Sequence, residues 1–385
     1  MALIINDDGI YDSETFSLSC TDSMLAGNCV GSLFHDIAAG YDTAEPPAAF
    51  YSMCAGILSS GSGIWNLGRC TQAQLRYAVQ TAKLDAAMYI ESSYGSSKVI
   101  VYSKSGFSLN TSEEKTISEL LHSRNMITGE KEGTMTDAQT LKSIYRSEIK
   151  AACPSLPEDT EIKINSSNAS IKTFLSDLIS DRSPDTQSRK NLIFQISGDG
   201  LRASAYSFET GFVFYERLIL LCCMDEFEKG NDIPLPYDFP VIADAIADKH
   251  HRKVYRYDPC SDNPSELSKK NISAEFSFLN DAAALIMKIL TVMNEKKMSF
   301  FELMSRIPLF TTTVKYISID NNHTESIEKV RNNAQKNVCY SDDNGRIIAK
   351  NSKSGKSLIL YAESYREETA DELCRTWMMN SDIRP

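Results

Sequence analysis

One pattern constrains the fold of this chain more than any other: helical segments alternate with short apolar runs along most of its length. Residues 48–58 place Phe50 and Met53 at helical spacing. The apolar runs 64–67 and 86–90 have the length of strands. Because helices and strands alternate in this way, we predict an α/β fold with mixed sheets.

The alternation is grouped into three successive α/β units and a smaller α+β unit at the C-terminal end. We therefore predict three mixed-sheet α/β domains and a C-terminal α+β domain around a central cleft. A polar stretch at 112–140 and a hinge at 226–236 separate some of these units. The predicted domains are residues 1–138, 139–231, 232–310 and 311–385.

Local signals predict individual helix boundaries. Thr71 is expected to cap a helix over residues 72–83, because a threonine oxygen accepts hydrogen bonds from the first helical N–H groups. A second helix is expected over residues 239–247.

Composition excludes several classes of protein. The formal net charge of -11 disfavours a nucleic-acid-binding protein, which needs a basic face. The sequence contains no run of 18 apolar residues, so we expect no membrane-spanning helix. The N-terminus lacks the basic and apolar regions of a signal peptide, so we expect none there. The ten cysteines form no CxxC pair, so we expect reduced thiols in a cytoplasmic protein.

Seven short stretches share their order and spacing with the motifs of one enzyme family. They are residues 8–10, 40–42, 66–79, 90–93, 197–202, 298–308 and 344–363. Together they resemble the α-D-phosphohexomutases, the family of phosphoglucomutase and phosphomannomutase, over most of the chain.

The resemblance implies a reaction that moves a phosphoryl group between two hydroxyls of one hexose. In the family a phosphoserine donates the group, Mg²⁺ held by three aspartates offsets its charge, and a separate loop holds the other phosphate. A hexose phosphate is thus the implied ligand and Mg²⁺ the implied cofactor.

The serine loop retains part of the family pattern. Ser93 falls on the nucleophile position, and Lys98 stands for the family's lysine, which assists proton transfer. Tyr94, Gly95 and Ser96 replace the family's His-Asn-Pro. The alternative is a solvated serine-glycine turn between two strands.

The metal loop departs further from the family. With Arg202 on the family's arginine, Ser197, Asp199 and Leu201 occupy the three aspartate positions. One carboxylate remains, and a leucine offers Mg²⁺ no oxygen, so tight metal binding is not expected. The alternative for Asp199 and Arg202 is an ion pair at a turn. The family's sugar-recognition motif is not found, and residues 275–278 lack its glycines.

The last loop is rich in lysine, serine and glycine. Its candidate phosphate-binding residues are Lys350, Ser352, Lys353, Ser354, Gly355 and Lys356. Ammonium, hydroxyl and backbone N–H groups in one loop are typical of an anion site. The alternative is a basic, solvated hairpin tip.

The sequence therefore predicts a phosphohexomutase-like protein with weakened or lost phosphoryl transfer. The alternative is a non-catalytic member that binds sugar phosphates or acts as a scaffold or regulator, which leaves a protein partner open.

Overall fold

The structure is a computed structural model of the whole chain. It describes residues 3–6, 9–93, 96–180, 190–318, 338–342, 345–351 and 357–380. The chain divides into two compact units. The first comprises Met1–Asp225 and Asp258–Met304, and the second comprises Glu226–Tyr257 and Ser305–Pro385.

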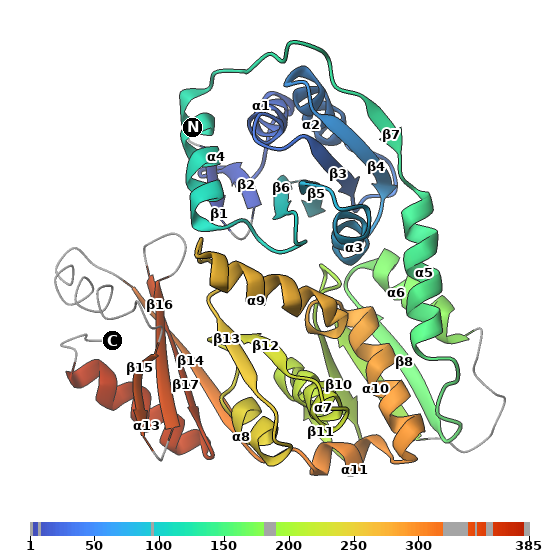
Figure 1. Cartoon of the computed structure of the whole chain (residues 1–385), viewed down its shortest axis with the longest axis vertical. Coiled ribbons are helices and arrows are strands. Elements are labelled where there is room, and N and C mark those ends of the chain that lie inside the picture. Colours follow the sequence, from blue (N-terminus) through green and yellow to red (C-terminus); the bar gives the residue numbers. More distant parts are fainter. Residues whose placement is uncertain are drawn as a thin grey trace. The chain divides into compact units, whose positions relative to one another are not determined.

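A seven-stranded mixed sheet in the order β1-β2-β6-β5-β3-β4-β7 begins the first unit (Figure 1). Strand β3 runs parallel to its neighbours β4 and β5, whereas β5 and β6 form an antiparallel hairpin. The strands are β1 (Leu3–Asn6), β2 (Gly9–Asp12), β3 (Asp36–Tyr41), β4 (Gly63–Arg69), β5 (Ala86–Ser93), β6 (Ser96–Ser103) and β7 (Met135–Asp137).

Helices cover both faces of this sheet (Figure 1). On one face lie α1 (Cys20–Gly31), α2 (Ala48–Ser59) and α4 (Thr111–Ser123), and on the other lies α3 (Gln72–Ala82). Because both faces are covered, the central residues of β5 are buried on both sides, which explains its continuous apolar run.

A four-stranded sheet in the order β11-β10-β9-β8 forms the rest of the first unit, together with helices from two parts of the chain. Its strands are β8 (Thr160–Ser166), β9 (Lys190–Ile196), β10 (Ala203–Ser207) and β11 (Gly211–Val213). The helical elements are α5 (Thr140–Ala152), α6 (Ala169–Ser180), α7 (Tyr215–Glu228), α9 (Pro264–Glu275), η1 (Ser277–Leu279), α10 (Ala282–Lys296) and α11 (Phe300–Ser305).

The second unit contains a parallel pair of strands and an antiparallel sheet in the order β14-β17-β16-β15. Helix α13 packs on the antiparallel sheet and buries Leu360 and Cys374. The elements are β12 (Ile233–Pro236), α8 (Ile242–Lys249), β13 (Val254–Tyr257), β14 (Thr311–Ser318), β15 (Val338–Asp342), β16 (Gly345–Asn351), β17 (Ser357–Ser364) and α13 (Glu367–Asn380).

The predicted fold class is confirmed, but one local prediction is wrong. Part of the expected hinge 226–236 forms β12, which pairs in parallel with β13 and buries Ile233 and Leu235 completely. Pro234 and Pro236 are tolerated in β12 because this strand has only one strand neighbour, so the N–H groups that proline lacks break no hydrogen bonds to a second strand. The division into four domains stays a prediction.

No helix among the described residues is long and apolar enough to cross a bilayer.

Candidate functional site

The first candidate residues lie on the hairpin of β5 and β6. Ser93 is the last residue of β5 and pairs with Ser96, and the intervening Tyr94 and Gly95 lie outside the described residues. Lys98 lies opposite Glu91, with its Nζ 3.0 Å from Glu91 Oε1. The lysine is therefore held in an ion pair at the base of the turn.

Gln72 and Asp42 hold this hairpin in place, and the sequence alone gave neither residue a role. Gln72 Nε2 donates to Glu91 Oε2 at 2.9 Å, while the Tyr102 hydroxyl donates to Gln72 Oε1. The Ser92 N–H donates to both Asp42 carboxylate oxygens at 3.1 Å. Burial raises the pKa of the Asp42 carboxyl, and the bond from Ser92 opposes that shift.

The loop 197–202 is closed by its own side chains and backbone. Asp199 Oδ1 accepts hydrogen bonds from the Ser197 hydroxyl and, at 2.9 Å, from the Leu201 N–H. The Arg202 N–H donates to Ser197 Oγ at 3.0 Å. The Arg202 guanidinium carbon lies 5.7 Å from the centre of the Tyr215 ring. Among the described ion pairs there is none between Asp199 and Arg202.

This loop does not offer the donor set of a Mg²⁺ site. Asp199 is its one carboxylate, and Ser197 and Leu201 occupy the flanking positions. Within the residues that the structure describes, no three His, Cys, Asp or Glu side chains gather closely enough to hold a metal ion. Mg²⁺ prefers several anionic oxygens in octahedral geometry, so the described residues do not fit the ion.

The hairpin and the loop 197–202 lie within electrostatic range of one another. Burial is the main cause that raises the pKa of Tyr102 on β6, and the negative charges of Asp199 and Glu91 raise it further. The loop is also tied to the start of α10, because the Ala282 N–H donates to the Gly200 carbonyl at 3.1 Å. The loop 197–202 therefore lies near the base of the hairpin, at Tyr102, whereas Ser93 and Lys98 lie nearer its tip.

The third predicted region lies in the second unit. Lys350 is in β16 and pairs with Ile359 of β17, so the loop joins two adjacent antiparallel strands. Ser352, Lys353, Ser354, Gly355 and Lys356 lie outside the described residues.

The stretch 275–278 has a packing role. Phe278 is buried, and its ring lies 6.0 Å from the Phe276 ring in an edge-to-face arrangement. The stretch therefore contributes an aromatic pair to the packing of this part of the first unit.

Comparison with solved structures shows which fold this is. A phosphoglucomutase/phosphomannomutase family protein from Burkholderia thailandensis is similar over 98% of this chain and 97% of its own, with a TM-score of 0.76 and 10% identity. A phosphomannomutase from Thermus thermophilus is similar over 98% of this chain and 99% of its own, with a TM-score of 0.66 and 11% identity.

A more distant likeness is to the N-acetylphosphoglucosamine mutase of Aspergillus fumigatus, solved in complex with GlcNAc-6P and magnesium. It extends over 90% of this chain and 76% of that protein, with a TM-score of 0.50 and 10% identity. No protein-family model and no curated protein matches the sequence. The predicted resemblance is confirmed at the level of the fold, which is that of the phosphohexomutases.

Proposed function

We propose that this chain, which has the phosphohexomutase fold, binds a hexose phosphate and has weakened or lost mutase activity. The fold and the lysine-rich loop 350–356 support ligand binding. The departures from the family pattern in the serine loop and in the loop 197–202 argue against normal turnover.

The proposed loss of activity rests on one observation. In the loop 197–202 a single carboxylate, that of Asp199, is already engaged by the Ser197 hydroxyl and the Leu201 N–H. Without a bound cation, charge on the transferred phosphoryl group loses several kcal/mol of stabilisation. A loss of about 4 kcal/mol would slow the reaction about a thousandfold.

The hairpin supports the same proposal. Lys98 is half-buried and its Nζ lies 3.0 Å from Glu91 Oε1, so its ammonium is already engaged within the hairpin. Glu91 is itself held by Gln72, which keeps the pair in place.

A non-catalytic scaffold or regulator is the second candidate, favoured if no hexose phosphate binds. Its partner would be a protein. A cytoplasmic location, indicated by the scattered cysteines of the sequence, stays a prediction.

The test combines binding with turnover on the full chain. Calorimetry with glucose 1-phosphate and mannose 1-phosphate should show binding that Lys350→Ala with Lys353→Ala weakens. The matched control is Lys249→Ala with Lys253→Ala, which removes two exposed lysines from the same unit and should leave affinity unchanged. A coupled assay with Mg²⁺ should show turnover about a thousandfold below an ordinary mutase.

Two results would count against the proposal. Turnover like that of an ordinary mutase would mean that the loop 197–202 works without three carboxylates. The absence of binding at millimolar hexose phosphate would favour the scaffold.

A further inference from the structure

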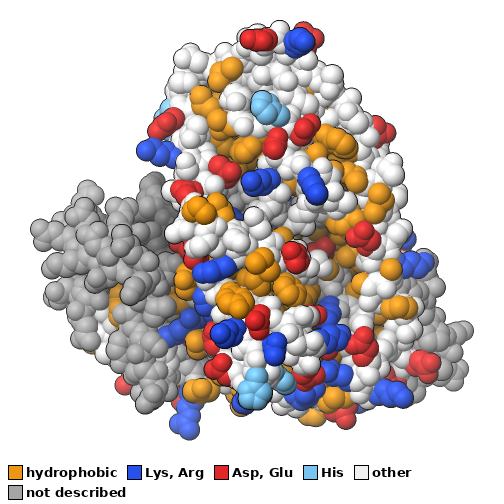
Figure 2. Space-filling view, viewed as in Figure 1, with side chains coloured by type: hydrophobic (Ala, Val, Ile, Leu, Met, Phe, Trp, Pro, Cys, Tyr) orange, Lys and Arg blue, Asp and Glu red, His pale blue; other side chains and the backbone are white. Residues whose placement is uncertain are grey.

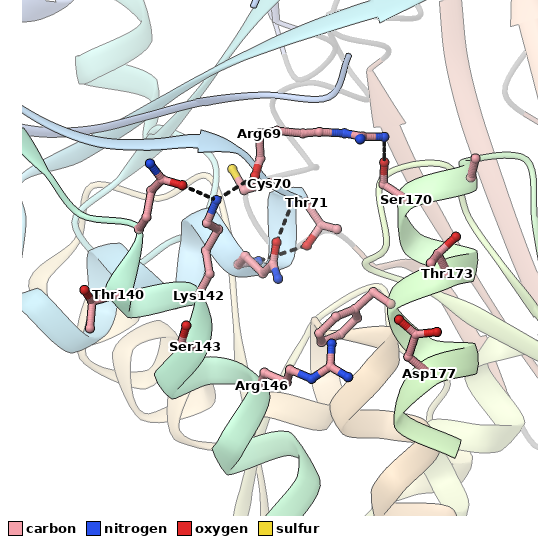
Figure 3. Close-up of a pocket in the computed structure, with 14 residues that line it drawn as sticks. Arg69, Cys70, Thr71, Thr140, Lys142, Ser143, Arg146, Ser170, Thr173 and Asp177 are labelled. Atoms are coloured by element: carbon pink, nitrogen blue, oxygen red, sulfur yellow. Dashed lines mark hydrogen bonds between the residues drawn. The ribbon is translucent and has the colours of Figure 1, made fainter. Parts of the chain in front are cut away.

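A cavity of about 740 Å³ lies within the first unit, and its lining includes no residue of the hairpin or of the loop 197–202 (Figure 3). Its wall is formed by the end of β4, the start of α3 and the first turns of α5 and α6. This volume is in the range of small-molecule sites, which are concave and carry a few placed polar groups.

Three cationic side chains line the cavity, and none of them is paired with a carboxylate among the described residues. Arg69 Nη2 donates to the Ser170 hydroxyl at 2.5 Å. Lys142 Nζ donates to the Arg69 carbonyl at 2.9 Å. The Arg146 guanidinium carbon lies 5.9 Å from the centre of the Phe174 ring. All three cations retain N–H groups for a ligand.

This cluster stands out against the rest of the protein. The chain has 51 acidic residues against 40 lysines and arginines, and basic and acidic side chains are interspersed on the face shown in Figure 2. Asp177 is the one acidic side chain among the lining residues. Three cations against one carboxylate leave the lining with a net positive charge, so the cavity favours an anion.

Neutral donors complete the lining. The hydroxyl groups belong to Thr71, Thr140, Ser143, Ser170 and Thr173. Helices α5 and α6 both begin at the cavity, and α5 has no side chain that caps its first turn. Helix N-termini attract negative charge, which adds to the field of the three cations.

We propose that this cavity binds a small phosphate monoester. Lys142 and Arg146 project from α5, with Arg146 beside Phe174, while the Arg69 guanidinium reaches across to Ser170 on α6 (Figure 3). The phosphate would be held between these cationic groups. Asp177 would accept hydrogen bonds from hydroxyl groups of the same ligand. The site is independent of residues 350–356, so the chain has two anion sites of different make-up.

The cavity lies next to the loop 197–202. Asn168, directly before α6, donates from its side chain to the Gly198 carbonyl at 3.1 Å. Ser170, the partner of Arg69, is two residues further along. A ligand that holds the start of α6 would therefore also steady that loop.

The experiment is calorimetric titration of the full chain carrying Lys350→Ala and Lys353→Ala, which removes the charge of the predicted phosphate loop. Inorganic phosphate and glucose 6-phosphate are the two probes. Adding Arg69→Gln and Arg146→Gln should weaken binding of the sugar phosphate about tenfold or more, because each lost charge-assisted bond is a strong one.

The matched control adds Lys172→Ala, an exposed lysine on α6 outside the lining, and should leave affinity unchanged. Circular dichroism verifies that all variants are folded. Weaker binding of glucose 6-phosphate only in the Arg69/Arg146 variant supports the site.

The proposal is overturned if the Arg69/Arg146 variant binds as its parent does, if Lys172→Ala has the same effect, or if the parent binds neither probe at millimolar concentration. Tighter binding of inorganic phosphate than of the sugar phosphate would overturn the assignment to a monoester. None of these outcomes depends on the hexose-phosphate site, since Lys350 and Lys353 are already replaced.

Discussion

A buried ion pair between Arg346 and Glu363 should set the stability of the second unit. The two residues face each other across β16 and β17, with Arg346 Nε 2.9 Å from Glu363 Oε2 and each side chain 9% exposed. Glu363 also accepts the N–H groups of Val241, at 2.8 Å, and Ile242, at 3.3 Å. Arg346 donates to the Phe239 carbonyl at 2.6 Å.

The two substitutions should differ in magnitude. Removing one partner of a buried ion pair costs about 3–5 kcal/mol, because the other charge stays buried. Burial already lowers the pKa of Arg346, as expected of a desolvated guanidinium. Glu363→Ala also leaves two N–H groups at the start of α8 without their acceptor, so we expect about 5 kcal/mol. Arg346→Met leaves the carboxylate its two backbone donors, so we expect about 3 kcal/mol.

The two tryptophans allow the second unit to be followed alone. Trp65 is in β4 of the first unit, and Trp377 in α13 packs against the core of the antiparallel sheet. In a Trp65→Phe background, urea unfolding monitored by tryptophan fluorescence reports on the second unit. The variant that combines Arg346→Met with Glu363→Ala should lose less free energy of unfolding than the two single variants added together. In the combined variant neither partner is left as an unpaired buried charge.

A loss below about 1 kcal/mol for both single variants, or strict additivity in the double variant, would refute this reasoning. The control is Arg375→Met in α13, which removes an exposed partner of Asp371. It should leave the urea midpoint almost unchanged, because surface ion pairs contribute little.

Three further outcomes are expected. Asp199→Ala should not alter Mg²⁺ binding in calorimetry, since one carboxylate is too few; micromolar binding lost in this variant would contradict that. Burial raises the pKa of Asp281, so the folded chain keeps a proton that the unfolded chain releases at lower pH. Wild type should therefore lose stability as pH rises from the ordinary value towards the raised one, and Asp281→Asn should not, as urea unfolding at pH 4 and pH 7 would reveal. Thr71→Ala should cost about 1 kcal/mol in thermal unfolding, because it opens the capping box with Gln74, whereas Thr71→Ser should not.

Local signals in the sequence predict local structure well. Thr71 caps α3, and the helix ends at Ala82, one residue before the predicted end, because Lys83 adopts a left-handed conformation. The helix α9 was missed, although Asn263 and Pro264 are typical of a helix start. Its sequence is polar and offers few apolar residues from which a helical period could be recognised.

The candidate site was predicted only in part, because its contacts depend on strand order. Ser93 and Lys98 follow from motif spacing within one hairpin. The bond from Ser92 to Asp42 joins residues 50 positions apart, and the bond from Gln72 to Glu91 joins residues 19 apart. The first arises because the parallel strands β3 and β5 are neighbours and end at the same edge of the sheet. Neither pairing can be read from one sequence.

The loop 197–202 is closed by hydrogen bonds among its own residues and does not rely on a cluster of charges. Three unpaired carboxylates in one short loop would repel each other, so a loop of that kind depends on its cation. Here Ser197 donates a hydrogen bond to Asp199 instead of adding a charge, and the Leu201 N–H supplies the other donor. The loop is therefore satisfied by its own groups, while Leu192 and Phe194 in the preceding strand stay fully buried. The core and the loop therefore make separate demands on the sequence, so the fold does not depend on the chemistry of this loop.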